Sequence, residues 1–232
     1  MILIPALGSE EMQAALKDEH VRKIVNILLS VIEQDIFKIV ALFLKQNSER
    51  ATPGFSIKLQ ALRRHGQNRS NAEGLFVSPL FIEELVQAIE ALYEQDTKKV
   101  GYLRGAIVEL LAYKLIYPRC ENGECFGNYR FVDRSSRYSS DQVDVAILSE
   151  NRKQIEGYGC KIKSTGIMSV DCTNLTALAA KAQELDYQVN VGLICFDNSN
   201  IIMQRIKSFP LDRAINAYGL DNILMLQETP FQ

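Results

Sequence analysis

The chain has 232 residues, a formal net charge of -2 and five cysteines. This size and composition suit a globular protein of one large domain or two small ones, and the charge excludes binding of nucleic acid through a basic overall field. No apolar run reaches the roughly 18 residues of a spanning helix, and the start lacks the basic segment of a secretory signal. An odd number of cysteines without framework spacing is typical of free thiols, so we expect a cytoplasmic protein with no membrane partner.

The first part of the chain has a helical pattern, because apolar residues recur every three or four positions. Ser78 and Pro79 have the types that cap and begin a helix, and Pro118 marks the end of another. The first predicted helical stretch covers residues 10–46 and breaks once near residues 18–21. Further helices are predicted over residues 57–64, 78–94 and 98–116, with polar loops over 47–56 and 65–74.

After Pro118 the pattern changes to short runs rich in β-branched, aromatic and apolar residues, which indicate strands. The predicted strands are 129–133, 143–148, 155–163, 191–196, 201–206 and 222–226, with helices over 174–186 and over 211–218, the last closed by Gly219. The predicted fold class is therefore α/β, with a helical N-terminal region over residues 1–97 and an α/β domain over residues 98–232.

Glu109 is the one charged residue on its face of the helix predicted over 98–116. That helix is apolar nearly all round, which is typical of a buried helix. An ionised carboxylate in such a place needs a partner, a metal or hydrogen bonds. The alternatives to a metal site are an ion pair with Arg104, Lys114 or a distant lysine, or a place at an exposed edge.

Two residues of the predicted strands have unusual types for their positions. Asp144 interrupts an apolar strand, although Asp is poorly suited to strand interiors; an edge strand that faces solvent is the alternative explanation. Lys161 alternates onto one strand face with Gly157, Gly159 and Lys163. A lysine beside a metal-bound water can orient that water or stabilise charge on phosphorus. The alternative is a surface strand with two ordinary lysines.

Three segments, Arg104-Gly105-x-x-x-Glu109, Val143-Asp144-Val145 and Gly159-Cys160-Lys161, resemble by order and spacing the PD-(D/E)xK superfamily, the restriction-endonuclease-like nucleases. The resemblance covers roughly residues 98–197 and implies a restriction-endonuclease-like mixed sheet flanked by helices. It also implies a magnesium-dependent deoxyribonuclease, hence a hydrolase, of bacterial defence or repair. In that family Glu109 and Asp144 would hold Mg²⁺ or Mn²⁺ and Lys161 would position the water, so these three are the expected catalytic residues.

Gly159 departs from the family, because it stands where an acid should be a metal ligand. Glu156 lies on the opposite face of a regular strand and would replace that acid only if a bulge turned it inward. Asp171 or Glu184 could supply a ligand that has migrated. Glu109 and Asp144 alone could still bind Mg²⁺, which often takes one or two carboxylates, but we expect weak binding. The alternative is a catalytically inactive domain that binds nucleic acid or a protein partner.

Basic residues outside the motif are expected to contact the phosphates of nucleic acid, DNA rather than RNA. They are Arg63, Arg64, Arg69, Arg130, Arg134, Arg137 and Lys163. Solvated loops on a near-neutral protein are the alternative. A third interpretation is a helical interaction protein whose apolar stretch over residues 21–44 binds a partner or forms a homodimer. Cys120 and Cys125 lack a second pair of ligands, so we expect a loop there and not a zinc site.

Overall fold

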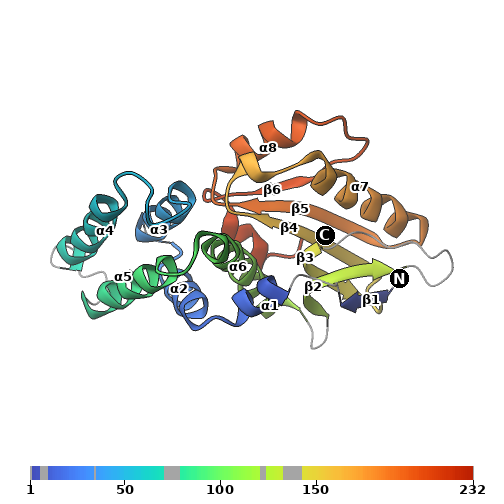
Figure 1. The fold of residues 1–232 in the computed structure, drawn as a ribbon. Helices are drawn as coiled ribbons and strands as arrows, with labels where there is room; N and C mark the ends of the chain where they lie inside the picture. Colours follow the sequence, from blue (N-terminus) through green and yellow to red (C-terminus); the bar gives the residue numbers. More distant parts are fainter. Residues whose placement is uncertain are drawn as a thin grey trace. The chain divides into compact units, whose positions relative to one another are not determined.

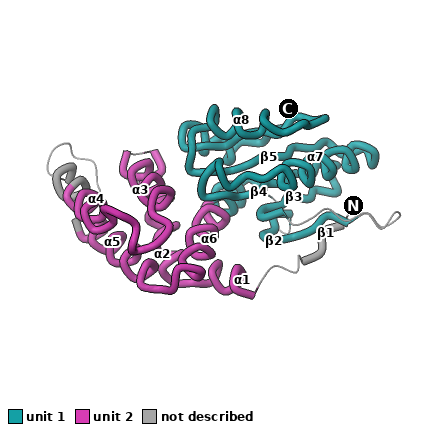
Figure 2. Tube along the Cα trace, turned by 45° about the horizontal axis from the view of Figure 1, so that its top comes forward, with its two compact units in different colours: residues 1–8, 112–232 teal, residues 9–111 magenta. Residues whose placement is uncertain are grey.

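The computed structural model describes residues 2–5, 10–33, 35–70, 79–120, 124–132 and 143–231, without the side chains of residues 2–5, 65–70 and 79. Its two compact units are residues 9–111, the helical unit, and residues 1–8 with 112–232, the sheet unit. Figure 2 shows the two units in different colours. The division falls within α6 (Thr97–Ile116), between Leu111 and Ala112, whereas the change of sequence pattern suggested residue 97.

The helical unit consists of amphipathic helices that bury their apolar faces against one another. Asp18 ends α1 and begins α2, because its carboxylate accepts the backbone N–H groups of His20 at 2.9 Å and Val21 at 3.2 Å. This is the predicted break, but a second break separates α2 from α3. The elements are α1 (Glu10–Lys17), α2 (Glu19–Ser30), α3 (Asp35–Gln46), α4 (Phe55–Ser70), α5 (Pro79–Tyr93) and most of α6.

The predicted polar loop over residues 65–74 is wrong for its first part, because α4 continues to Ser70. Gly and polar residues there lower the intrinsic helix propensity. Helix α4 packs against α5, and the Arg63 guanidinium, just before this segment, holds the Glu83 carboxylate across the two helices at 2.9 and 3.1 Å. Tertiary contacts therefore override the local sequence preference.

The sheet unit is a mixed sheet with the strand order β1-β2-β3-β4-β5-β6. Neighbouring strands are antiparallel from β1 to β4, whereas β4, β5 and β6 run parallel (Figure 1). The strands are β1 (Ile2–Pro5), β2 (Cys125–Val132), β3 (Val143–Ser149), β4 (Gln154–Lys161), β5 (Gln188–Cys195) and β6 (Asn216–Tyr218). The structure thus confirms the predicted α/β class, with a helical N-terminal part followed by a mixed sheet.

Helix α7 (Ser169–Glu184) forms the crossover between the parallel strands β4 and β5 and covers one face of both (Figure 1). Leu178 of α7 belongs to the apolar core on that face, together with Leu193 of β5 and Ile202 of α8 (Ser199–Lys207). The 3-10 helices η1 (Tyr117–Arg119) and η3 (Ile223–Gln227) are linked by Arg119 Nε, which donates to the Leu226 carbonyl at 2.8 Å.

Three elements predicted near the C-terminal end were wrong. The predicted strand over 201–206 is α8, in which Ile202 and Ile206 are four positions apart and bury the same helix face. The predicted helix over 211–218 contains β6, which forms because it pairs with β5. The predicted strand over 222–226 is η3. Local apolar patterns of this length fit either a helix or a strand, so the neighbours in space decide.

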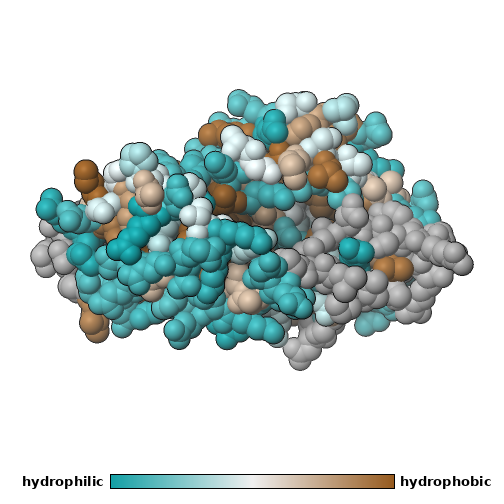
Figure 3. All heavy atoms as spheres, viewed as in Figure 1, coloured by the Kyte–Doolittle hydropathy of each residue, from teal (hydrophilic) through white to brown (hydrophobic). Residues whose placement is uncertain are grey.

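Where Figure 3 colours the described residues, the face is mainly hydrophilic, with hydrophobic residues in small separate patches. None of the helices in the described ranges has both the length and the apolar character of a transmembrane helix.

Candidate functional site

The site lies where β4 ends and α7 begins, on the sheet face that α7 covers. Gly157, Gly159 and Lys161 share this face of β4. A Cβ atom at Gly157 would lie 2.6 Å from Leu178 Cδ2, so α7 packs closely on the strand. Lys161 is the last residue of β4, and the first turn of α7 follows after η2 (Ser164–Gly166). The chain therefore brings the start of α7 back over the end of β4.

Asp144 of β3 reaches this site from the neighbouring strand. Its Oδ2 accepts the backbone N–H of Cys160 at 2.6 Å. Burial raises the pKa of Asp144 to about 6, and the charge of Asp171 also raises it, while the Cys160 N–H and the charge of Lys161 act in the opposite direction. The strand acid predicted from the sequence is thus a carboxyl group that titrates close to neutral pH.

Lys161 and Asp171 form an ion pair, with Nζ 2.9 Å from Oδ1. The other carboxylate oxygen of Asp171 accepts the N–H of Met168 at 2.8 Å, so Asp171 also caps α7. Burial lowers the pKa of the Lys161 ammonium, but the hydrogen bond and charge of Asp171 and the charge of Asp144 outweigh burial and raise it. One ammonium group therefore interacts with two carboxyl groups from different elements.

Gly159 has a physical reason to lack a carboxylate in this fold. It lies opposite Leu193 of β5, and a Cβ atom at residue 159 would lie 2.9 Å from Leu193 Cδ2. Leu193 is fully buried, so an acid at residue 159 would require that side chain to move. Of the two migrated ligands considered from the sequence, Asp171 lies beside Lys161. Glu184 has a side chain that is 65% exposed and pairs with Lys181 near the other end of α7.

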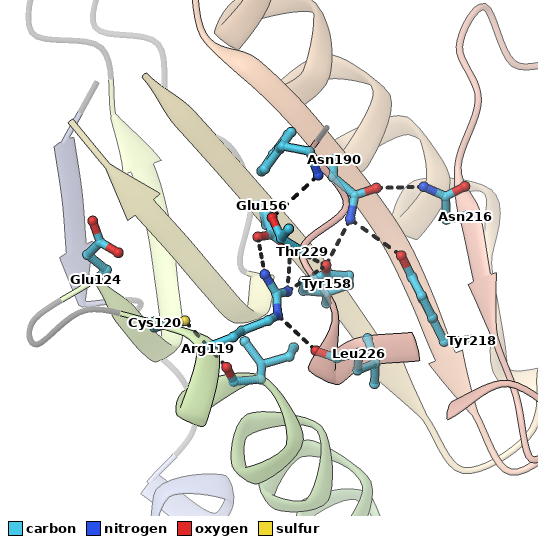
Figure 4. A network of polar contacts seen from close by, with 12 residues as sticks. Arg119, Cys120, Glu124, Glu156, Tyr158, Asn190, Asn216, Tyr218, Leu226 and Thr229 are labelled. Carbon is cyan, nitrogen blue, oxygen red and sulfur yellow. Dashed lines mark hydrogen bonds and ion pairs between the residues drawn. The ribbon is translucent and has the colours of Figure 1, made fainter. Parts of the chain in front are cut away.

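Glu156 lies on the opposite sheet face, as strand alternation predicted. Its carboxylate receives two hydrogen bonds from the Arg119 guanidinium, at 2.7 and 2.6 Å, and one from the Tyr158 hydroxyl. Asn190 extends this network by donating to the Tyr158 hydroxyl at 2.8 Å (Figure 4). Because the Glu156 carboxylate forms a buried ion pair with Arg119, it does not replace the missing acid.

Glu109 lies on α6 within the helical unit and is 5% exposed. Arg104, one of the ion-pair partners considered for it, donates to the Leu44 carbonyl at 2.9 and 2.6 Å and to the Lys45 carbonyl at 3.3 Å. The role of Glu109 as a metal ligand stays a prediction. The contacts of Asp144, Lys161 and Asp171 involve only residues of the sheet unit.

The predicted nucleic-acid contacts lie in several different places. Arg63 is held by Glu83 in the helical unit, and Arg64 is exposed there. Lys163 is exposed just after β4, and Arg130 of β2 has a buried Nε with no hydrogen-bond partner in the described part of the chain. The side chain of Arg69 and both Arg134 and Arg137 lie outside the described residues. The role of all these residues in binding nucleic acid stays a prediction.

Two carboxylates, Asp144 and Asp171, are the donors that this site offers to a metal ion. No cluster of three or more His, Cys, Asp or Glu with metal-binding geometry occurs among the described residues. Two hard oxygen donors nevertheless fit Mg²⁺, which keeps several waters and needs only one or two carboxylates beside substrate phosphates. The residues of the site are therefore compatible with a weakly held Mg²⁺ or Mn²⁺ ion.

No protein-family model matches the chain, and no curated protein matches it. Among solved structures, the chain resembles protein VC1899 from Vibrio cholerae, with 14% identity and a TM-score of 0.41, over 97% of this chain and 57% of that one. It also resembles Can2 from Sulfobacillus thermosulfidooxidans in complex with cyclic tetra-adenylate, with 14% identity and a TM-score of 0.39, over 83% of this chain and 52% of that one. The chain thus spans little more than half the length of either protein. At this level of similarity, neither structure bears on the family or the function of this chain.

Proposed function

We propose that the sheet unit is a metal-dependent nuclease of the PD-(D/E)xK type that acts on DNA, in which Asp171 takes the place of the acid missing at Gly159. The observation that supports this is the meeting of Asp144, Lys161 and Asp171 at the end of β4. They come from β3, β4 and α7, and two of them match the family motif by position. Two carboxylates can hold a divalent metal ion, and a lysine beside them can stabilise the charge that develops on phosphorus during phosphodiester hydrolysis.

In this proposal Asp144 and Asp171 hold the metal ion, and Lys161 acts on the reacting atoms. A bound Mg²⁺ or Mn²⁺ ion would act as a Lewis acid and lower the pKa of a water. The Lys161 ammonium would donate hydrogen bonds to that water or to a phosphate oxygen. Backbone donation from Cys160 keeps the Asp144 carboxylate turned toward the end of β4.

A catalytically inactive domain that binds nucleic acid or a protein partner is the second candidate. The observation that favours it is the ion pair itself, because the Lys161 ammonium already neutralises Asp171. Gly159 removes the third carboxylate, and the packing of Leu193 keeps that position closed. In such a domain the Lys161 ammonium would occupy the position that a metal ion takes in the nuclease.

Titration of the full chain with Mn²⁺ in a calorimeter, followed by Mg²⁺- and Mn²⁺-dependent cleavage of plasmid DNA, separates the two candidates. The nuclease binds Mn²⁺ and nicks the plasmid, and both Asp144→Ala and Lys161→Ala abolish nicking. Glu184→Ala is the matched control, because it removes an exposed acid from the same helix as Asp171. Cleavage that persists in both site variants would reject these roles, whereas absence of heat and of cleavage would favour the inactive domain.

A further inference from the structure

Cys120 and Cys125 bring two thiols into contact on a part of the sheet unit that the proposed nuclease site does not use. Cys120 directly follows η1, and its Sγ donates to the Ile116 carbonyl at 3.4 Å. Cys125 is the first residue of β2 and is held by pairing with Ile147 of β3. The side chains of the two cysteines are hydrogen-bonded to each other. Strand pairing on one side and a helical turn on the other therefore fix the thiols as neighbours.

The surroundings make the two thiols unequal. The hydrogen bond from Cys125 and the positive charge of Arg119 lower the pKa of Cys120, although burial and the charges of Glu156 and Glu124 oppose them. The same hydrogen bond and burial raise the pKa of Cys125. Cys120 is also the more exposed of the two. The thiolate, which is the reactive form of cysteine, therefore forms more readily at Cys120 than at Cys125, which is the thiol beside it.

Two of the buried cysteines, Cys172 and Cys195, show how burial acts on a thiol in this protein. Cys172 and Cys195 are fully buried, and burial is the largest cause that raises their pKa, to about 11 and about 12. A cation lies near each of these thiols as well, Arg205 near Cys172 and Lys161 near Cys195, but its charge lowers the pKa less than burial raises it. Cys120 and Cys125 do not belong to a metal cluster among the residues that the structure describes. Their arrangement is that of an attacking thiol and a resolving thiol.

We propose that Cys120 and Cys125 are a peroxide-reactive dithiol that closes reversibly to a disulfide. The Cys120 thiolate attacks one oxygen of hydrogen peroxide, the O–O bond breaks, and hydroxide leaves to give a sulfenic acid on Cys120. The Cys125 sulfur then attacks the sulfenic sulfur and the S–O bond breaks. The departing hydroxide takes up the proton of the Cys125 thiol and leaves as water. In total, two thiols and one peroxide give one disulfide and two waters, so the sulfurs are oxidised and the peroxide is reduced.

The new bond would tie β2 to the residue that follows Arg119. Figure 4 shows Cys120 next to Arg119, whose guanidinium is held by Glu156 and by the Leu226 carbonyl. Oxidation would thus act beside the central ion pair of the opposite sheet face, away from Lys161 and Asp171. This inference is independent of the proposed nuclease activity.

Hydrogen peroxide treatment of the folded full chain, followed by intact mass measurement and a non-reducing peptide map, tests the proposal. We expect the loss of two hydrogen atoms, a Cys120–Cys125 cross-link, and recovery of the starting mass with dithiothreitol. In Cys125→Ser the reaction should stop at a sulfenic acid on Cys120 that dimedone traps. Cys172→Ser is the matched control and should behave like the wild type.

Absence of a Cys120–Cys125 cross-link while the thiols are consumed, or dimedone labelling that prefers another cysteine, would overturn the proposal. A second measurement needs no variant. Iodoacetamide should alkylate Cys120 of the native wild-type chain before Cys172 and Cys195. Equal rates for the three thiols would equally overturn the assignment.

Discussion

The Lys161 ammonium lies 2.9 Å from the Asp171 carboxylate and so joins the last residue of β4 to the first turn of α7. The two side chains are 28% and 18% exposed, which shields the pair partly from solvent. Because Asp171 also accepts the Met168 N–H, the backbone of α7 fixes its carboxylate. The pair therefore holds a lysine and an acid in place beside Asp144 without any contribution from residue 159.

Asp171→Asn should separate the metal-binding role of this residue from its structural role. The amide oxygen can still accept the Met168 N–H, so we expect a loss of stability of only about 1 kcal/mol from the weakened ion pair. Loss of a charged ligand should lower the affinity for Mn²⁺ at least about tenfold, since even loss of a residue that supports a ligand costs that much. Calorimetric titration measures the affinity, with Glu184→Gln as the control. Unchanged Mn²⁺ binding in Asp171→Asn would remove Asp171 from the site.

Because of Asp144, the free energy of unfolding of the metal-free protein should fall as the pH rises from about 4 to about 6. Its pKa is about 6 in the folded chain against the ordinary value of 3.8, so in this window the folded chain keeps a proton that the unfolded chain has released. The stabilising effect of that proton is present at the low end and is lost as the pH passes the folded pKa. At higher pH the cost is up to about 3 kcal/mol, since one pKa unit corresponds to about 1.4 kcal/mol.

Asp144→Asn removes this titration. In urea unfolding across the pH range, the stability of the variant relative to the wild type should rise between about pH 4 and pH 6 and then stay constant. Asp212→Asn, at an exposed position, is the control for general charge effects. A stability difference for Asp144→Asn that is the same at every pH would contradict the raised pKa.

Of the three residues of the candidate site, the sequence singled out Asp144 and Lys161 directly, whereas it offered Asp171 only as one of two possible migrated ligands beside Glu184. Asp144 and Lys161 stand out because they break the pattern of their own strands. Asp171 becomes part of the site only through the crossover from β4 into α7. The predicted helix began at residue 174, because Ser169, Val170 and Thr173 have low helix propensity, whereas α7 begins at Ser169.

The same distinction between local patterns and contacts of distant segments applies to the fold. The central strands and α5, α6 and α7 were predicted within a few residues, because each has a long apolar pattern of one period. The short edge strand β6 depends on pairing with β5, and pairing partners cannot be seen in a short local segment. Gly219 shows this well: it was predicted as a helix cap, but a Cβ there would lie 2.3 Å from the Asp197 carbonyl oxygen. This glycine is required because two backbone segments approach closely, and not because a helix ends there.

Gly159→Asp should restore a third carboxylate if the space for it is made. Combination with Leu193→Val removes the methyl group that the new Cβ would meet, at a cost of about 1 kcal/mol. We expect the double variant to bind Mn²⁺ more tightly than the wild type, measured by calorimetry, and to cleave plasmid DNA faster. Leu193→Val alone is the control and should bind Mn²⁺ as the wild type does. If the double variant folds but gains no affinity, residue 159 does not face a metal site.

Arg119 and Glu156 should matter for stability and not for cleavage, since they lie on the sheet face opposite Lys161. Their side chains are only 12% and 3% exposed, so Arg119→Met leaves a buried carboxylate without its cation. Removal of one partner of a buried pair costs about 3–5 kcal/mol, whereas replacement of both by apolar residues costs much less.

We therefore expect Arg119→Met to lower the free energy of unfolding in urea strongly, and the double variant with Glu156→Met to recover a large part of the loss. Arg50→Met is the matched control, because its ion pair with Glu94 is about 60% exposed and is worth less than about 1 kcal/mol. Cleavage per folded molecule should be the same in all these variants at a temperature where each is folded. If the buried pair costs no more to break than the exposed one, Arg119 contributes little to stability. A selective loss of cleavage would return Glu156 to the list of candidate acids.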